Sequence, residues 1–467
     1  MSIAFLDPGN IEADLQSGAA ADYKLFWVLL WSTVLGLLVQ RLAARIGTVT
    51  GQHLAEVCYS EYRPLPRTFL WLMMEVAIIG SDMQEVIGTA IAIFLLSNRT
   101  IPLWKGVLIT IFDTFTFVFL DSYGLRKLEL FFAFLIATMA FTFGFEFFLS
   151  RPEFGEIMEG IFVPMCSGCG KTELMQAIGI VGSCIMPHNL YLHSGLVKTR
   201  QVDRTRDESI SEANFYYFIE SGLALFVSFI INVFVMSVFA KGLYAKTNED
   251  VVSYVKSINA IISFNLQNNT DAVDVDIYSG GAFLGCQFGM AALYIWAVGI
   301  LAAGQSSTMC GCYSGQFTME GMLNLKWRRW RRVLFTRSLA LLPTLYVASF
   351  STLDAFSGMN DMLNALMSLQ LPFAVLPAIA FSSNTRIMGP FANGITNKII
   401  AVLIFCLIVA INSAFVFAFV STLSGVPSIV SVTIYGCIYI PVTLYLLLHT
   451  IAALTSTDSR LNSSQVW

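Results

Sequence analysis

The chain has 467 residues and a formal net charge of -4, and 56% of its residues are apolar while only 12% are charged. A soluble globular protein carries roughly twice this charged fraction, so the composition excludes an ordinary water-soluble domain. The basic residues are scattered through loops, which argues against a nucleic-acid partner. We find no hydrolase triad and no phosphate-binding loop, and we expect no enzyme activity.

Apolar runs predict about twelve membrane-spanning helices, because a helix needs roughly 20 apolar residues to cross a bilayer. The expected fold class is an all-α, polytopic membrane protein in which residues 1–467 form one transmembrane domain within a lipid bilayer. The predicted spans are 1–18, 25–47, 68–97, 101–122, 128–149, 173–197, 215–240, 281–309, 332–352, 359–383, 398–421 and 427–454.

The first span is broken by Asp7-Pro-Gly-Asn10. Proline removes a backbone donor and glycine tolerates unusual torsions, so such a break frees backbone carbonyl groups that can bind a cation. Asp7 adds an anionic oxygen and Asn10 a neutral one. Only six residues precede Asp7, and we expect an incomplete first helix, as in a fragment, a truncated gene model or a splice form.

The third span contains Asp82 and Glu85, which lie three residues apart and so share one helix face. Charged groups at this depth are costly and usually functional. Arg337, inside the ninth span, is a plausible partner for one of them. The alternative is an ion-pair network that only holds helices 3 and 9 together.

Two features lie between spans. Asn98 and Asn268 each begin a glycosylation sequon in a predicted external loop. Cys166 and Cys169 form a lone Cys-x-x-Cys, for which a local disulfide or two free thiols fits better than a zinc site.

The sixth span is broken at Met186-Pro-His188. The Met186 thioether is a soft ligand, which favours transition metals over calcium and magnesium, although ordinary packing is the alternative in a chain with 18 methionines. His188 titrates near physiological pH. Breaks in the first and sixth spans fit two inverted five-helix repeats and indicate the substrate site of a transporter.

Loops after the even-numbered spans carry most of the basic residues, including the cluster Lys326-Trp-Arg-Arg-Trp-Arg-Arg332. The positive-inside rule therefore places both termini in the cytoplasm. We expect a plasma-membrane or endosomal/lysosomal protein, and the sequence leaves its oligomeric state open.

Three strings resemble the NRAMP family of divalent-metal transporters, and the similarity is closest to its animal members. Ser2–Glu12 resembles the family's first-helix signature and Gly182–Ser194 its sixth, while Gly304–Phe317 resembles a long cytoplasmic-loop motif after span 8. The resemblance implies a LeuT-like core with repeats at 1–149 and 173–383, followed by two additional helices at 398–454. It also implies proton-coupled symport of Fe²⁺ and Mn²⁺, and of Co²⁺ and Cd²⁺, toward the cytoplasm, without a cofactor.

The resemblance further implies roles for individual residues. Asp7, Asn10 and Met186 match the metal-ligand side chains, while Ala4 and Ser183 match positions whose carbonyl groups approach the ion. Ser183 replaces a more usual alanine, which should matter little if only its carbonyl binds. Asn364 matches an amide that closes over the ion. The implied proton route comprises His188, Asp82, Glu85 and Arg337. The short start leaves the alternative of a truncated, non-transporting or regulatory membrane form.

Overall fold

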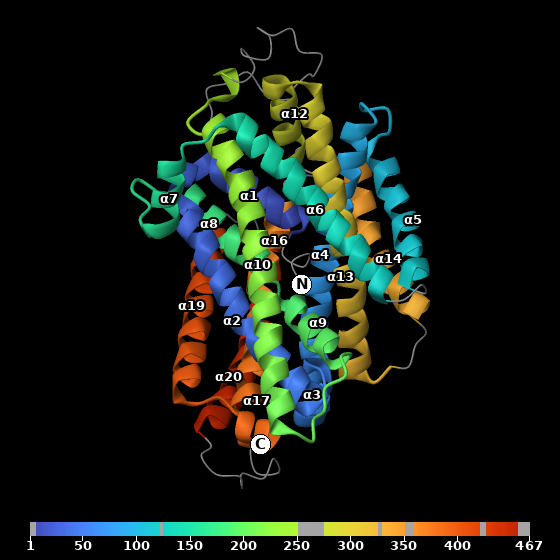
Figure 1. Ribbon diagram of the computed structural model, residues 1–467, viewed down its shortest axis with the longest axis vertical. Coiled ribbons are helices and arrows are strands. Elements are labelled where there is room, and N and C mark those ends of the chain that lie inside the picture. Colours follow the sequence, from blue (N-terminus) through green and yellow to red (C-terminus); the bar gives the residue numbers. More distant parts are fainter. Residues whose placement is uncertain are drawn as a thin grey trace.

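The computed structural model describes residues 6–121, 125–250, 275–325, 329–350, 359–420 and 426–455. These residues form a long bundle of helices (Figure 1). The elements are α1 (Pro8–Ala21), η2 (Asp22–Leu25), α2 (Phe26–Thr50), α3 (Leu54–Glu61), α4 (Pro64–Leu96), α5 (Leu103–Asp121), α6 (Leu125–Ser150), α7 (Phe154–Phe162), α8 (Lys171–Cys184), α9 (Pro187–Lys198), α10 (Asp207–Leu243), α12 (Ile277–Phe288), α13 (Met290–Leu323), α14 (Arg329–Phe350), α16 (Met359–Gln370), α17 (Pro372–Ser383), α18 (Thr385–Met388), η3 (Gly389–Phe391), α19 (Ile395–Val420) and α20 (Val426–Thr455).

Within the described ranges, eight helical stretches are long and apolar enough to cross a membrane, so the chain is a multi-pass membrane protein. Each predicted span corresponds to one helix or to a broken pair. Span 173–197 divides into α8 and α9, and span 359–383 into α16 and α17. Span 281–309 divides at Gly289, whose φ of 93° suits glycine, into α12 and a longer α13.

The segment Gly304–Phe317 lies inside α13, so its expected place in a cytoplasmic loop is wrong. Its small residues suit a helix contact instead of a turn. A Cβ at Gly304 would overlap Thr89 Oγ1, and one at Gly311 would overlap Asp82 Oδ1. Glycine at these positions therefore lets α13 pack very closely against α4.

Burial separates an inner core from an outer layer of helices. In the apolar 18-residue window of the α16–α17 stretch, 89% of the residues are buried, whereas in that of α19 only 28% are buried. Both α19 and α20 pack against α17 at one side of the bundle (Figure 1). Helix α1 and the divided pairs α8–α9 and α16–α17 thus lie inside, where a lipid-inaccessible site can form.

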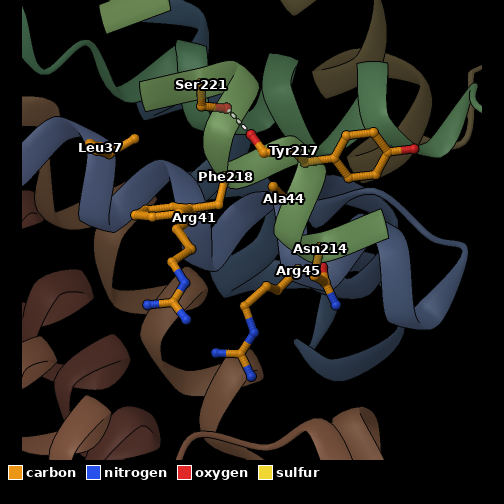
Figure 2. Close-up of a pocket in the computed structure, with 8 residues that line it drawn as sticks. All are labelled: Leu37, Arg41, Ala44, Arg45, Asn214, Tyr217, Phe218 and Ser221. Atoms are coloured by element: carbon orange, nitrogen blue, oxygen red, sulfur yellow. Dashed lines mark hydrogen bonds between the residues drawn. The ribbon is translucent and has the colours of Figure 1, made fainter. Parts of the chain in front are cut away.

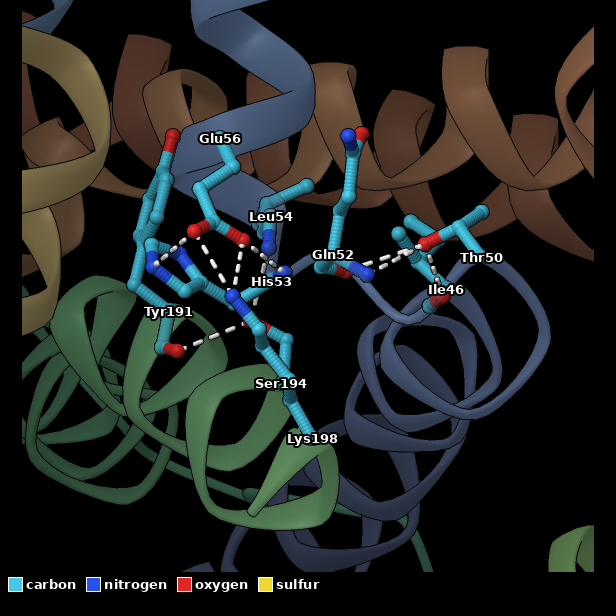
Figure 3. Close-up of polar contacts among 9 residues, drawn as sticks. All are labelled: Ile46, Thr50, Gln52, His53, Leu54, Glu56, Tyr191, Ser194 and Lys198. Carbon is cyan, nitrogen blue, oxygen red and sulfur yellow. Dashed lines mark hydrogen bonds and ion pairs between the residues drawn. The ribbon is translucent and has the colours of Figure 1, made fainter. Parts of the chain in front are cut away.

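One end of the bundle, which we call the α3 end, carries α3, the end of α9 and the start of α10; the opposite end carries α12 (Figure 1). At the α3 end, Lys198 of α9 donates to both Glu56 carboxylate oxygens, at 2.7 and 2.6 Å (Figure 3). The Leu54 amide donates to Ser194 Oγ at 2.9 Å. These contacts tie the second half of the sixth span to α3.

His53 precedes α3 and its side chain is 4% exposed. Burial lowers the pKa of His53 to about 4, although Glu56 opposes this shift. Nε2 of His53 lies 3.6 Å from Glu56 Oε1, and the Lys198 and His53 contacts lower the pKa of Glu56 against the effect of burial. The imidazole is therefore neutral near pH 7 beside a charged pair.

Candidate metal site

The first part of the site is the start of α1. Asp7 is its N-cap residue, and its Oδ1 accepts a hydrogen bond from the Asn10 amide at 2.8 Å. Pro8 occupies the first helical turn, where a missing N–H costs nothing. The side chain of Asp7 is fully buried, and among the described residues its Oδ2 has no hydrogen-bond partner. A buried carboxylate oxygen in this state is available to a cation.

The second part is the break between α8 and α9. Cys184 ends α8, Ile185 and Met186 leave helical geometry, and Pro187 starts α9. Because proline donates no hydrogen bond and disfavours a helical residue before it, the break falls directly before Pro187. Met186 is 2% exposed, so its thioether lies within the protein interior.

The start of α1 and the break before Pro187 face each other through Ser183. Its Oγ donates to Asn10 Oδ1 at 3.1 Å, and Cys184 Sγ lies 3.9 Å from the same oxygen. The Ser183 hydroxyl therefore contacts a proposed ligand, while the role of its carbonyl stays a prediction. Ala4 lies outside the described residues.

Asn364 on α16 closes one side of this region. Its Nδ2 donates to the Gly9 carbonyl at 3.0 Å, and its Oδ1 accepts from Gln84 Nε2 at 2.7 Å. A Cβ added at Gly9 would lie only 2.5 Å from Gln84 Nε2, so the Gln84 side chain packs directly against the Gly9 backbone. Sequence reasoning missed Gln84, although an amide between Asp82 and Glu85 in an apolar span was a usable signal.

Nowhere in the described ranges do three or more His, Cys, Asp or Glu side chains gather closely enough to hold a metal ion. A metal site here has to combine one carboxylate with amide oxygen, backbone carbonyl and thioether sulfur. This mixed oxygen and sulfur donor set suits a transition-metal cation better than calcium.

A buried ion cluster lies on the neighbouring helices. Arg337 of α14 contacts Glu85 through Nη2 at 2.8 Å and Asp82 through Nη1 at 3.6 Å, both on α4. Its Nη2 also donates to the Thr308 carbonyl of α13 at 3.0 Å. The three charged side chains are at most 4% exposed, and two acids face one base.

His188 belongs to the turn that follows the second break. It is 1% exposed, and its carbonyl accepts from Ser314 Oγ of α13 at 2.9 Å. Ser314 lies about one turn from Gly311, which packs against Asp82. Helix α13 therefore connects the His188 region with the ion cluster, although no direct bond joins them in the described part.

The remaining predicted positions are the two sequon asparagines and the two cysteines of the Cys-x-x-Cys. Asn98 follows α4 in a turn, with φ of 50°, and Asn268 lies outside the described residues. Cys166 and Cys169 form a disulfide. The nearby Ser167 carbonyl accepts from Lys24 at 3.2 Å, so this loop contacts the connection after α1.

Comparisons with known proteins agree on one family. The profile described as Nramp, natural resistance-associated macrophage protein-like, matches residues 1–418. Malvolio of Drosophila melanogaster is 59% identical over 472 residues, covering 100% of this chain and 79% of its own length. Natural resistance-associated macrophage protein 2 of Homo sapiens is 58% identical over 446 residues, covering 96% of this chain and 78% of its own.

A solved structure of a metal transporter has a similar fold. A single-residue mutant of the Eremococcus coleocola manganese transporter superposes with a TM-score of 0.80 at 25% identity, covering 97% of this chain and 92% of that one. The predicted fold class, an all-α membrane protein with a LeuT-like core, is confirmed.

Proposed function

The chain belongs to the Nramp family, and we propose that it therefore carries divalent transition-metal cations across a membrane. The proposed cargo is Fe²⁺ and Mn²⁺, with Co²⁺ and Cd²⁺ as further substrates. The observation that carries the proposal is the buried Oδ2 of Asp7, which has no hydrogen-bond partner among the described residues and lies where the start of α1 faces the break between α8 and α9. The similarity to a manganese transporter supports the choice of cargo.

In this proposal Asp7 supplies the charge, and Asn10 and Met186 supply neutral oxygen and sulfur. The carbonyl groups of Ser183 and Ala4 complete the ligand set. The sulfur disfavours calcium and magnesium, which bind all-oxygen shells. Asn364, held by Gln84, contacts the Gly9 carbonyl and closes the site from α16.

We further propose that metal and protons move together toward the cytoplasm. His188, Asp82, Glu85 and Arg337 form the proposed proton route. The cluster of two acids with one base leaves one carboxylate without a balancing charge, and such a group can hold a proton. A cation near Asp7 favours its ionised form, which links metal binding to proton release.

The proposed orientation places the α3 end, and both termini, in the cytoplasm. At that end Lys198 binds Glu56 of α3 and Arg67 donates to the Tyr59 carbonyl of α3. Arg63 and Arg200 follow α3 and α9 within two residues, in agreement with the positive-inside rule. Asn98 then lies outside and is available for glycosylation. The proposed location is the plasma membrane or an endosomal or lysosomal membrane.

Uptake of radiolabelled Mn²⁺ into proteoliposomes at two external pH values tests the proposal. We expect faster uptake at the lower pH, competition by Fe²⁺ but not by Ca²⁺, and no uptake by the Asp7→Asn variant. Asp203→Asn, a change in the exposed connection after α9, is the matched control. Strong pH-driven uptake by Asp7→Asn would refute the site, and none by the unmodified chain would refute transport.

A further inference from the structure

A pocket away from the metal site lies between α2 and α10, near the α3 end. It has about 220 Å³ of empty space, counting the part open to solvent. Arg41 and Arg45 of α2 line it together with Asn214, Tyr217 and Phe218 of α10 (Figure 2). The two arginines lie four residues apart, so they occupy one face of α2.

Among the described residues, the pocket is lined by two basic side chains and by no acidic one. Within the described ranges, neither Arg41 nor Arg45 has a carboxylate within 4.0 Å. Their guanidinium groups point to the same side in Figure 2. Two guanidinium groups on one helix face, with no carboxylate of the described residues within 4.0 Å, favour an anion, and their planar donors match phosphate oxygens.

The two arginines are fixed in different ways. Arg45 donates to Asn393 Oδ1 at 2.6 Å and to the Phe391 carbonyl, so its side chain is held by the segment that follows α17. Arg41 is exposed and lies over the Phe218 ring, 5.1 Å from its centroid. The pocket therefore presents one anchored cation and one that rests on an aromatic face.

The sequence of α10 places this pocket at the membrane boundary. The helix begins with polar residues up to Asn214, after which Phe215 and Tyr216 are 61% and 59% exposed. Leu223 and Phe226, further along, are 66% and 57% exposed. Exposed aromatic residues at the start of an apolar helix face mark the headgroup level, and the apolar face beyond them contacts acyl chains.

We propose that this pocket binds the phosphomonoester headgroup of an anionic lipid, whose acyl chains lie along the exposed face of α10. A basic pocket between membrane helices suits such a headgroup, and the proposed orientation places it in the cytoplasmic leaflet. The proposal is independent of the metal cargo. A free phosphate ion offers the same oxygens but gains nothing from the apolar face, so competition distinguishes the two sources.

Native mass spectrometry of the full-length protein in detergent tests this, with dioleoyl phosphatidic acid as the probe. We expect dioleoyl phosphatidic acid to bind and dioleoyl phosphatidylcholine not to displace it. Arg41→Gln should weaken binding about tenfold, because one charge-assisted contact is lost. Arg206→Gln, which removes an equal charge from the exposed connection before α10, should bind like the unmodified chain.

The free energy of unfolding of Arg41→Gln should lie within about 1 kcal/mol of that of the unmodified chain, because among the described residues Arg41 makes only the exposed contact with the Phe218 ring. Phe218→Leu provides a second variant and should also weaken binding. Equal binding of the two lipids, or undiminished binding by Arg41→Gln, would overturn the site. Displacement of the lipid by an equimolar amount of inorganic phosphate would overturn the lipid assignment.

Discussion

Arg337 is the only base in contact with Asp82 and Glu85 in the described part of the chain, so its removal is an informative perturbation. In Arg337→Met, an unbranched apolar side chain replaces the guanidinium group. Two carboxylates then remain buried, with exposures of 2% and 1%, and neither has a positive partner. The Thr308 carbonyl also loses its donor.

The expected cost follows from this geometry. Breaking a buried ion pair by removing one partner costs about 3–5 kcal/mol, because the remaining charge stays desolvated. Replacing every charge in the cluster removes that penalty. We therefore expect the triple variant Asp82→Asn, Glu85→Gln, Arg337→Met to unfold within about 1–2 kcal/mol of the unmodified chain.

Equilibrium unfolding in mixed detergent micelles measures these free energies, and proteoliposome uptake measures transport. The single variant should be strongly destabilised, and the triple variant should recover stability while its Mn²⁺ uptake no longer responds to external pH. If the triple variant is as unstable as the single one, charge desolvation is not the cause. If its uptake keeps the full pH response, the cluster is not part of the proton route.

Two further predictions concern other contacts. The pKa of His53 is 6.5 in the unfolded chain and about 4 in the folded protein. The free energy of unfolding is therefore highest above pH 6.5 and falls as the pH drops toward 4. From about pH 7.5 to about pH 5.5 the free energy of unfolding should fall by about 1.4 kcal/mol. The His53→Gln variant should not show this fall, and identical pH profiles of the unmodified chain and the variant would contradict the prediction. In Gly182→Ala the new Cβ would overlap the Asn364 carbonyl oxygen, so we expect a loss of about 1–3 kcal/mol and of Mn²⁺ uptake. Gly179→Ala, with open space at its Cβ, is the control, and equal unfolding and uptake of the two variants would argue against a tight contact.

The start of α1 after Asp7 and the break before Pro187 could be predicted because proline acts locally. A missing donor and a fixed torsion interrupt a helix whatever surrounds it. The order of the spans could be predicted for a similar reason, since most of the apolar runs are long enough to cross a bilayer by themselves. These features need no knowledge of the partner helices.

Contacts between helices are harder to predict. Gly304–Phe317 is rich in glycine and serine, which are common both in loops and at close helix contacts, so composition alone does not separate the two. The hydrogen bond from Gln84 to Asn364 joins residues 280 positions apart, and no local pattern indicates such a pair. The contact of the Ser183 hydroxyl is likewise hidden from the sequence because its target, Asn10, lies on another helix.

The close approach of α13 to α4 has a mechanical consequence. Helices in contact at Gly304 and Gly311 leave no room for one to slide past the other, so we expect them to move as one rigid body that includes Asp82 and Glu85. The proposed metal-binding segment around Asp7 is joined to its neighbours by hydrogen bonds with Ser183 and Asn364, and Pro8 packs closely against Gly88 of α4. In the proposed transport, the electrostatic work of coupling would depend on the separation between the metal ion and the Asp82 and Glu85 carboxylates.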